Sequence, residues 1–302
     1  MLWLAENSGG TSGSAAAVHH TPVLVELLNH HFGEPVHHFQ MKYTHPFWQN
    51  VLGRFDTTPE AVFGAYTPET AIPWYTVMFV IACLITMIAI WVLKGKLSED
   101  DPTPGQQTLE AGVLAIEDLL TGTVGKHALK YFPVIATFGV LILVSNLMGQ
   151  VPGLMSPTAS TSVTLALGIS SFAYYNYIGI RENGLFGHLS HFAGPLLLLA
   201  PLLFPIELIS NIIRPISLGI RLFGNMFADE QVIGNITNLA PPYTNWIVPV
   251  ALMPLGVFVA FIQTFIFVFL SIVYISEVSH PPHDEHHDHA EENEQIIAPV
   301  LT

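Results

Sequence analysis

The sequence predicts an all-α polytopic membrane protein, because apolar residues dominate it and gather into long runs. Its 302 residues are 51% hydrophobic and only 11% charged, with a mean hydropathy of +0.49, which lies outside the range of an ordinary soluble domain. Asp, Glu, Lys, Arg and His are absent from residues 74–93, 131–148, 158–180 and 246–275. At about 1.5 Å per residue, each run is long enough to cross a hydrocarbon core about 30 Å thick as a helix.

The first membrane helix is expected over residues 74–93, with residues 1–73 before it and a loop over residues 94–130 after it. Four of the nine basic residues lie in this loop: Lys94, Lys96, Lys126 and Lys130. Basic residues accumulate in the short cytoplasmic loops of membrane proteins, so the loop is expected inside and residues 1–73 outside, in the periplasm. The single cysteine, Cys83, lies within the helix and is expected to be a packing residue.

Within the cytoplasmic loop, apolar residues recur at helical spacing. Leu109, Val113, Ile116 and Leu120 are three or four residues apart. Such a stripe predicts an amphipathic helix over residues 108–120. Because acidic residues occupy its other face, this helix is expected to lie on the membrane surface.

The remaining membrane helices are expected as two pairs, for about five membrane helices in all. Residues 131–180 should form a hairpin joined on the outside by residues 149–157, and residues 192–276 a long, tilted helix pair. The last apolar run has 30 residues and would extend about 45 Å as a straight helix, so it must tilt, kink or end in the interface. Pro249 and Pro254 favour a kink.

Ionisable residues interrupt the first helix of the long pair. They are Glu207, Arg214, Arg221, Asp229 and Glu230. At about 100° per residue along a helix over 205–237, the side chains within about 40° of Arg221 are Glu207, Ser210, Arg214, Ser217 and Asn225. A charge at bilayer depth costs about 2.5–3.5 kcal/mol on insertion scales, so a polar stripe is retained there where it meets water or a charged partner. The stripe therefore predicts an ion path.

The two arginines of the stripe receive different predictions. Arg221 lies about 21 Å along the helix from Glu207, near the middle of the membrane if Glu207 is interfacial. Since Asp229 and Glu230 lie two turns beyond it, its partner is expected on another subunit. Arg214 keeps two alternatives to a role on the path, which are local pairing with Glu207 and snorkelling to the cytoplasmic interface.

The other polar residues of the pair also keep structural alternatives. Asp229 and Glu230 are interpreted either as groups of the ion path or as carboxylates that solvate the outer end of the helix. Asn225 and Gln263 belong either to the path or to a helix–helix hydrogen bond. Close helix approach is the alternative for Ser217, Gly219 and Gly224.

Histidine and acidic residues are concentrated near the two ends of the chain. Seven of the 23 acidic residues lie within 277–294, so the net charge of -14 belongs largely to an acidic, His-rich cytoplasmic tail over 277–302. His pairs occur at 19–20, 30–31 and 37–38. Solvated segments are predicted here, with a weak transition-metal site as the alternative. No pattern indicates a nucleic-acid partner, a cofactor, a phosphate-binding loop or a catalytic triad.

One segment carries a recognisable motif. Residues 217–228 are Ser-Leu-Gly-Ile-Arg-Leu-Phe-Gly-Asn-Met-Phe-Ala, and Glu230 follows shortly after. This pattern resembles the signature of the a subunits of F-type ATP synthases, the membrane stators of a rotary enzyme. The resemblance extends to Pro-Ile-Glu at 205–207 and to Gln-Thr-Phe-Ile-Phe at 263–267, and so covers most of residues 201–277.

The resemblance implies that the long helix pair packs against a ring of c subunits, each with a carboxyl group in the membrane. Arg221 would be the stator arginine that prevents proton leakage. The half-channel open to the outside would contain Asn225, Glu230 and Gln263. The half-channel open to the cytoplasm would lie near Glu207, Ser210 and Asn211. Some relatives carry a His or Glu where this chain has Gly256, so the outer channel is expected to rely on Asp229 together with Glu230.

The same resemblance implies a non-catalytic subunit in a bacterial inner membrane. Its partners would be the c-subunit ring, the b-subunit peripheral stalk and the rest of the synthase, with the lipid bilayer around it. Two other classes of function stay open on the residues alone. An ion-coupled secondary transporter also uses intramembrane charges, although such carriers usually have duplicated halves, which are not apparent here. A purely structural anchor would leave the polar stripe unexplained.

Overall fold

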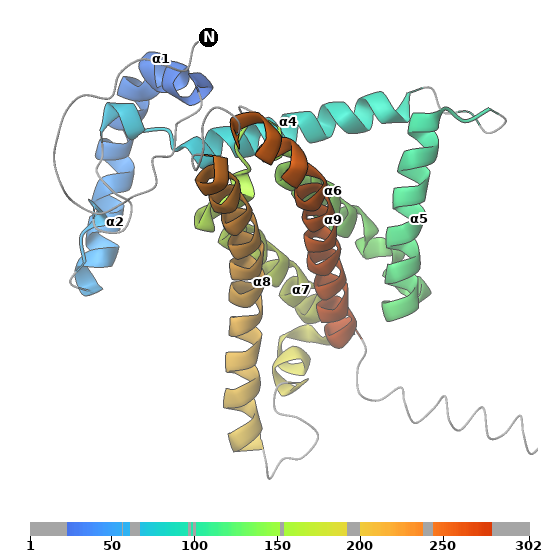
Figure 1. Cartoon of the computed structure of the whole chain (residues 1–302). Coiled ribbons are helices and arrows are strands. Elements are labelled where there is room, and N and C mark those ends of the chain that lie inside the picture. The colour runs from blue at the N-terminus through green and yellow to red at the C-terminus, as the bar shows by residue number, and fades with distance from the viewer. Residues whose placement is uncertain are drawn as a thin grey trace, which may run out of the picture. The chain divides into compact units, whose positions relative to one another are not determined.

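The computed structural model describes residues 23–55, 57–60, 67–95, 98, 101–151, 154–191, 200–237 and 244–279. Every regular element in these ranges is a helix or a helical turn, and none is a strand (Figure 1). The chain divides into two compact units, Met1–Trp74 and Tyr75–Thr302. The all-α fold class is thus confirmed. The His pair at 19–20 and the tail from residue 280 lie outside the described residues.

The described part of the first unit is mainly helical, whereas the sequence analysis predicted no secondary structure for residues 1–73. Helix α1 (Val23–Phe39) continues through a π-helical turn, η1 (Gln40–Thr44), into α2 (His45–Leu52), and short 3-10 turns follow at η2 (Gly53–Phe55) and η3 (Pro68–Thr70). Asn29 of α1 binds both backbone groups of Ile72, at 3.1 and 2.9 Å. A Cβ atom at Gly33 would lie 2.2 Å from the carbonyl oxygen of Pro68, so a glycine is required where α1 meets η3.

Helix α4 (Trp74–Lys94) covers the predicted first membrane helix. Its buried side includes Met78 and Ala82, whereas large apolar side chains such as Met87 and Trp91 are exposed. The helix ends at Gly95, whose positive φ of 49° is a backbone conformation that suits glycine. An apolar helix exposed on one side is typical of a segment that faces lipid or another subunit.

Helix α5 (Pro104–Val124) is longer than the predicted amphipathic helix. Thr103 caps it by accepting a hydrogen bond from the backbone of Gln106, and Pro104 occupies the first position, where its missing N–H costs nothing. The predicted apolar stripe is buried toward the C-terminal end of α5, where Leu120 is fully buried, whereas Val113 in the middle of the helix is exposed. The last turns of α5 therefore pack on protein, against α9.

The hairpin consists of a 3-10 turn, η4 (Lys126–Tyr131), then α6 (Phe132–Met148), a second 3-10 turn, η5 (Pro157–Ala159), and α7 (Thr161–His191). Helix α7 extends beyond residue 180, where the predicted hairpin ends. Its helical backbone is broken at Gly184, which has a positive φ of 70°. The start of this extension is bound to η4, because Glu182 accepts hydrogen bonds from Lys130 and Tyr131.

The long helix pair consists of α8 (Ala200–Thr237) and α9 (Thr244–Ser279), with 38 and 36 residues. At about 1.5 Å per residue both are longer than a hydrocarbon core is thick. Pro249 and Pro254 lie in the first third of α9, and the ribbon changes direction there (Figure 1). Helices α7, α8 and α9 all pack against one another.

Three stretches of the described chain are helical, long and apolar enough to cross a membrane: Pro68–Lys94, His127–Met148 and Val250–Ser279. Helices α7 and α8 are long enough but more polar. In α7 the apolar run contains Ser, Asn and several Tyr residues, and α8 carries five charged residues. Their position among the apolar helices, rather than their composition, associates α7 and α8 with the membrane.

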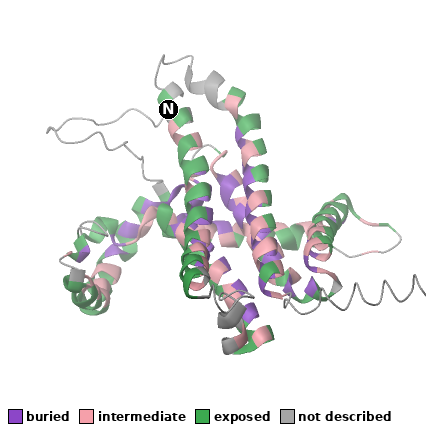
Figure 2. Ribbon diagram, turned by 90° about the horizontal axis from the view of Figure 1, so that it is seen from below, coloured by how far each residue is buried: buried purple, intermediate pink, exposed green. Residues whose placement is uncertain are grey.

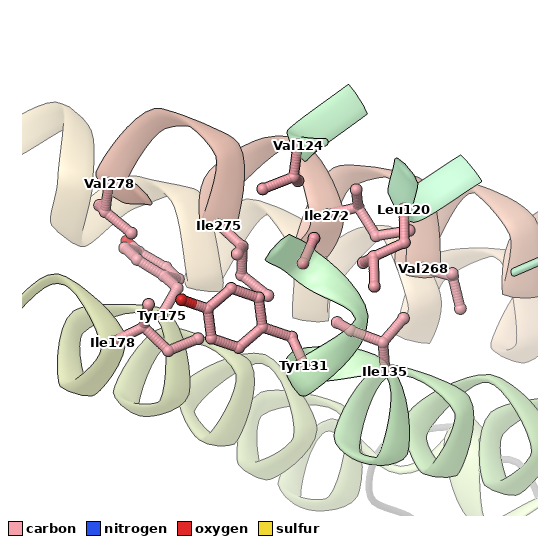
Figure 3. Close-up of a cluster of buried hydrophobic side chains, with 11 residues drawn as sticks. Leu120, Val124, Tyr131, Ile135, Tyr175, Ile178, Val268, Ile272, Ile275 and Val278 are labelled. Carbon is pink, nitrogen blue, oxygen red and sulfur yellow. The ribbon is translucent and has the colours of Figure 1, made fainter. Parts of the chain in front are cut away.

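Two apolar clusters hold the second unit together. The larger joins α5, η4, α6, α7 and α9 (Figure 3), and its members are Leu120, Val124, Ala128, Tyr131, Ile135, Tyr175, Ile178, Val268, Ile272, Ile275 and Val278. The smaller joins α6, α7, α8 and α9 through Ile142, Val163, Leu167, Leu218, Leu222 and Phe267. In a membrane, where lipid tails are as apolar as these side chains, such clusters hold helices together by close van der Waals packing. The smaller cluster thus fixes α8, which carries the polar stripe, against α6, α7 and α9.

Helices α7 and α8 approach each other at glycines. A Cβ atom would lie 2.9 Å from the Thr164 carbonyl oxygen at Gly219, and 2.5 Å from the Pro215 carbonyl oxygen at Gly168. Gly219 thus allows close contact between α7 and α8 of this chain. At Gly224 a Cβ atom would meet nothing within 4 Å.

Candidate functional site

The predicted polar stripe of α8 divides by exposure. Ser217, Arg221 and Asn225 are exposed, whereas Asn211 is buried. Glu207, Ser210, Arg214, Asp229 and Glu230 are half-buried. Figure 2 shows the pattern on the ribbon, with buried residues where helices meet and exposed residues along the outward faces of the long helices. The middle of the stripe is therefore exposed, with Ser217 and Arg221 on the outward face of α8.

Arg221 has no ionic partner in the described part of the chain. The ion pairs found there join His45 to Glu60, Lys130 to Glu182, and Arg214 to both Glu207 and Glu277. An arginine is always charged in proteins and presents its donors in a fixed planar fork. Arg221 thus offers an uncompensated cation on the outward face of α8.

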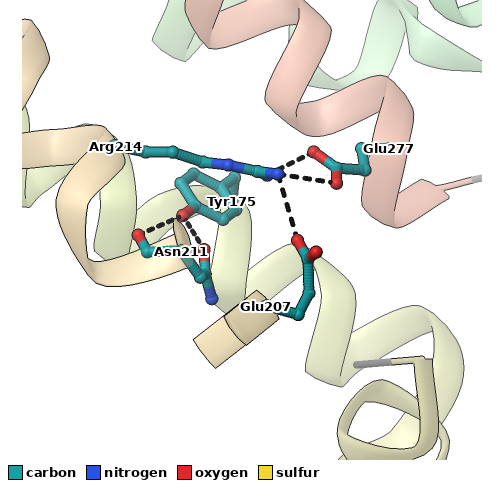
Figure 4. Close-up of polar contacts among 5 residues, drawn as sticks. All are labelled: Tyr175, Glu207, Asn211, Arg214 and Glu277. Carbon is teal, nitrogen blue, oxygen red and sulfur yellow. Dashed lines mark hydrogen bonds and ion pairs between the residues drawn. The ribbon is translucent and has the colours of Figure 1, made fainter. Parts of the chain in front are cut away.

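Arg214 is paired twice (Figure 4). Its Nη2 donates to Glu277 Oε1 at 2.9 Å and to Glu207 Oε1 at 3.2 Å, and its Nη1 also donates to Glu277. The guanidinium lies over the ring of Tyr274, 5.3 Å from its centroid, which adds a cation–π contact. Of the alternatives for Arg214, pairing with Glu207 is the one the structure contains. Glu277 was missed because it follows the last apolar run and was assigned to the tail.

Asn211 is held by a tyrosine that the sequence did not single out. The Tyr175 hydroxyl donates to Asn211 Oδ1, and both side chains are buried (Figure 4). The Tyr175 ring packs on Tyr274 with the centroids 5.6 Å apart. We name Tyr175, Glu207, Asn211, Arg214, Tyr274 and Glu277 the Arg214 cluster, where α7, α8 and α9 meet. Since Tyr175 lies in an apolar run with other tyrosines, no sequence signal distinguished it.

Asn225 and Gln263 form a bond between α8 and α9. Asn225 Nδ2 donates to Gln263 Oε1 at 2.5 Å. The helix–helix hydrogen bond that the sequence left as an alternative is therefore present. Gln263 is 1% exposed, and its Nε2 has no hydrogen-bond partner among the described residues. An unpaired buried polar group costs about 1–3 kcal/mol, so this atom marks a place where a hydrated or transient partner is favoured.

The carboxylates near the end of α8 bind the segment between α6 and α7. Glu230 Oε1 accepts from the backbone N–H of Ser156 at 3.2 Å. Asp229 Oδ2 accepts from Gln150 Nε2 at 3.0 Å. The two adjacent carboxylates thus have separate, neutral donors. We name Gln150, Ser156, Asp229 and Glu230 the Glu230 cluster.

A buried polar network extends from Ser156. Its hydroxyl donates to the Ser145 carbonyl at 2.9 Å and lies 2.6 Å from the Thr158 hydroxyl, which donates to Asn146 Oδ1 at 2.6 Å. All four residues are at most 1% exposed. Ser145 Oγ and Asn146 Nδ2 have no hydrogen-bond partner within the described ranges. Sequence reasoning missed this network, because isolated Ser, Thr and Asn residues are common in apolar helices.

The described residues contain no group of three or more His, Cys, Asp or Glu side chains that could hold a metal ion. The histidines at 30–31 pack edge to face with each other. The His-rich tail, on which the metal alternative mostly rested, lies outside the described residues. Cys83 is a half-buried free thiol.

The charged groups of α8 therefore form two sets, with Glu207 and Arg214 toward its start and Asp229 and Glu230 toward its end. Arg221 lies between the two sets. Glu207 and Glu230 are 23 residues apart by number, which corresponds to about 35 Å of helix, near the thickness of a membrane. Arg221 lies between them on the exposed face. This arrangement places carboxylates near both ends of the helix and a central charge where a group outside the chain can contact it.

These features define the chain as a multi-pass, all-α membrane protein with a charged helix among its spans. The sequence model of the ATP synthase A chain family matches residues 76–276. The chain belongs to this family. It is therefore a subunit of the ATP synthase complex and functions in proton transport and ATP synthesis. The resemblance seen in residues 217–228 is confirmed, and it displaces the transporter and anchor alternatives.

Curated relatives of the same family match this chain over most of their own length. The ATP synthase subunit a of Nitratiruptor sp. is 40% identical over 215 residues, covering 71% of this chain and 92% of the relative. That of Aquifex aeolicus is 40% identical over 205 residues, covering 66% and 94%. That of Geotalea daltonii is 38% identical over 231 residues, covering 76% and 96%.

Proposed function

We propose that this chain is the non-catalytic stator that guides protons to and from a ring of c subunits through two half-channels. The observation that supports this most is Arg221, an exposed cation without an ionic partner among the described residues, between two polar clusters of one helix. A ring carboxylate is the kind of partner that a planar guanidinium binds best.

The surface around Arg221 suits a rotor of apolar helices. Exposed apolar side chains of α8 include Ile206, Ile209, Ile213, Ile216, Ile220 and Phe227. On α9 they include Leu255, Phe258, Phe261, Ile262 and Phe265. A ring carboxyl group is neutral in lipid, because its charge is costly there, and it ionises where a cation compensates it. Arg221 would provide that compensation and block direct leakage between the half-channels.

The outer half-channel is assigned to the Glu230 cluster and the groups beside it. Glu230 and Asp229 would take up protons, and the buried network through Ser156 would lead water inward. The path would end near Gln263 and Asn225, where an unpaired buried amide favours hydration. A proton delivered there would neutralise the ring carboxylate and release it into lipid.

The inner half-channel is assigned to Glu207 and Asn211, which belong to the Arg214 cluster, and to Ser210. Ser217 lies on the stripe between these residues and Arg221. After nearly a full turn, the ring carboxyl would lose its proton here to the cytoplasm. Each proton that crosses releases about 2.3 kcal/mol per 100 mV, and several contribute to one ATP formed in the catalytic head. The chain would thus convert a field into torque without covalent chemistry.

The orientation and partners follow as part of the proposal. The basic loop 94–130 and the C-terminal tail would be cytoplasmic, and residues 1–73 would be periplasmic in a bacterial inner membrane. The exposed apolar side of α4, with Leu84, Met87 and Trp91, would face lipid and the b-subunit peripheral stalk.

Substitution Arg221→Ala in the complete complex, reconstituted in vesicles, tests this function. We expect proton-driven ATP synthesis to be lost while the complex still contains the c ring. Arg181→Ala is the matched control, since Arg181 is exposed and lies beyond the apolar run of α7. Synthesis retained in Arg221→Ala would overturn the proposal.

A further inference from the structure

Gln150 occupies the space in front of Gly256. A Cβ atom at Gly256 would lie 2.3 Å from Oε1, 2.4 Å from Nε2 and 2.5 Å from Cδ of Gln150. The whole amide therefore stands where a side chain of residue 256 would project from α9. Gln150 is the second residue after α6, and its backbone N–H donates to the Leu147 carbonyl at 3.0 Å.

The same amide reaches α8. Its Nε2 donates to Asp229 Oδ2 at 3.0 Å, so one side chain from the end of α6 lies against α9 and binds α8. The neighbouring Glu230 takes its hydrogen bond from the backbone of Ser156 instead. Asp229 and Glu230 thus bind different donors, and the Gln150 amide is bound to Asp229.

We propose that Gln150 is a positioning residue of the outer half-channel, and that Gly256 is required because it admits the Gln150 amide to Asp229. This inference rests on the proposed function and extends it to a residue outside the recognised motif. A neutral amide is suited to this role, since it donates to a carboxylate without adding a charge that would repel an incoming proton.

Gly256→Ala is the first test. The clashing atoms belong to the end of a flexible side chain, so the added methyl group should displace the Gln150 amide rather than unfold the helix pair. Hydrogen bonds to charged groups are strong enough that we expect proton-driven ATP synthesis in vesicles to fall about tenfold, with the c ring still bound. The substitution should have no further effect in a Gln150→Ala background.

Substitutions of Gln150 itself separate the hydrogen bond from its volume. Gln150→Leu and Gln150→Glu both fill the space, but neither presents the amide N–H, and we expect both to lower synthesis about tenfold. Gln107→Leu is the matched control, because Gln107 is exposed on α5. A wild-type rate in either Gln150 variant, or an independent loss from Gly256→Ala in the Gln150→Ala background, would overturn the inference.

ATP synthesis by the Arg221→Ala complex, measured in parallel, distinguishes failure of this inference from failure of the proposed stator function. If Arg221→Ala is inactive and Gln150→Leu is fully active, the stator proposal stands and the role of Gln150 fails. If Arg221→Ala is active, the stator proposal fails, and the inference fails with it.

Discussion

The two polar ends of α8 differ in how their carboxylates are compensated. In the Arg214 cluster, Glu207 and Glu277 share one guanidinium, which also stacks on Tyr274. In the Glu230 cluster, the recorded donors to Asp229 and Glu230 are an amide and a backbone N–H, both neutral. An ion pair joins a carboxylate to a group of opposite charge and holds the two helices together, whereas a neutral donor fixes the carboxylate without a countercharge. We therefore expect the ion pairs of Arg214 to act as a clamp between α8 and α9 beside the inner half-channel, and Glu230 to act as the exchange site of the outer half-channel.

The largest expected effect tests the exchange site. Glu230→Gln preserves the shape of the side chain but removes its ability to carry a proton, so proton-driven ATP synthesis should fall at least about tenfold. Measurement of synthesis in vesicles, with the c-ring content determined on the same sample, checks this. If Glu230→Gln instead lowers assembly and leaves the rate per complex unchanged, the two ends do not differ as described.

An intermediate effect tests the clamp. Arg214→Ala leaves Glu207 and Glu277 unpaired, and because the guanidinium is only partly buried we expect a loss of stability of about 1–3 kcal/mol, below that of a fully buried pair. The thermal midpoint of the purified complex should fall, and Arg214→Ala combined with Glu277→Gln should be less destabilising than Arg214→Ala alone. Arg181→Ala serves as the control. An unchanged midpoint would show that the ion pair does not clamp the helices.

The smallest expected effect concerns a neutral contact of the same cluster. Tyr175→Phe removes the hydroxyl that donates to Asn211, so the buried amide oxygen loses its donor. We expect a loss of about 1 kcal/mol, seen as a small decrease in the thermal midpoint with synthesis per complex unchanged. A larger loss of synthesis than of stability would assign Tyr175 to the proton path.

The helical framework and the polar stripe could be predicted because both depend on local sequence. Runs without charge define long helices, and a step of about 100° per residue places Arg214, Arg221 and Asn225 on one face. The motif around Arg221 also sufficed to indicate the family. The sequence also offered close helix approach at Gly219, without indicating which helix is approached. Close helix approach does occur there, but the neighbour is α7 of this chain, and sequence spacing carries no information about which helix is opposite.

The residues that were missed act through partners distant in the chain. Glu277 lies 63 residues from Arg214, and Gln150 lies 79 residues from Asp229. In the sequence, Glu277 adjoins an acidic tail and Gln150 follows an apolar run without any motif of its own. Neither residue has a local pattern that distinguishes it, because its role depends on which helices pack together.

The sequence by itself determined the membrane class, the family, the helix that carries the charges and the isolation of Arg221 from nearby carboxylates. Only the tertiary structure decided that Arg214 is clamped by Glu277 and that Gln150 fills the space left by Gly256 to reach Asp229. The physical reason is that helical periodicity sets the face on which a side chain lies. Its partner on that face is set by packing among helices that are remote along the chain.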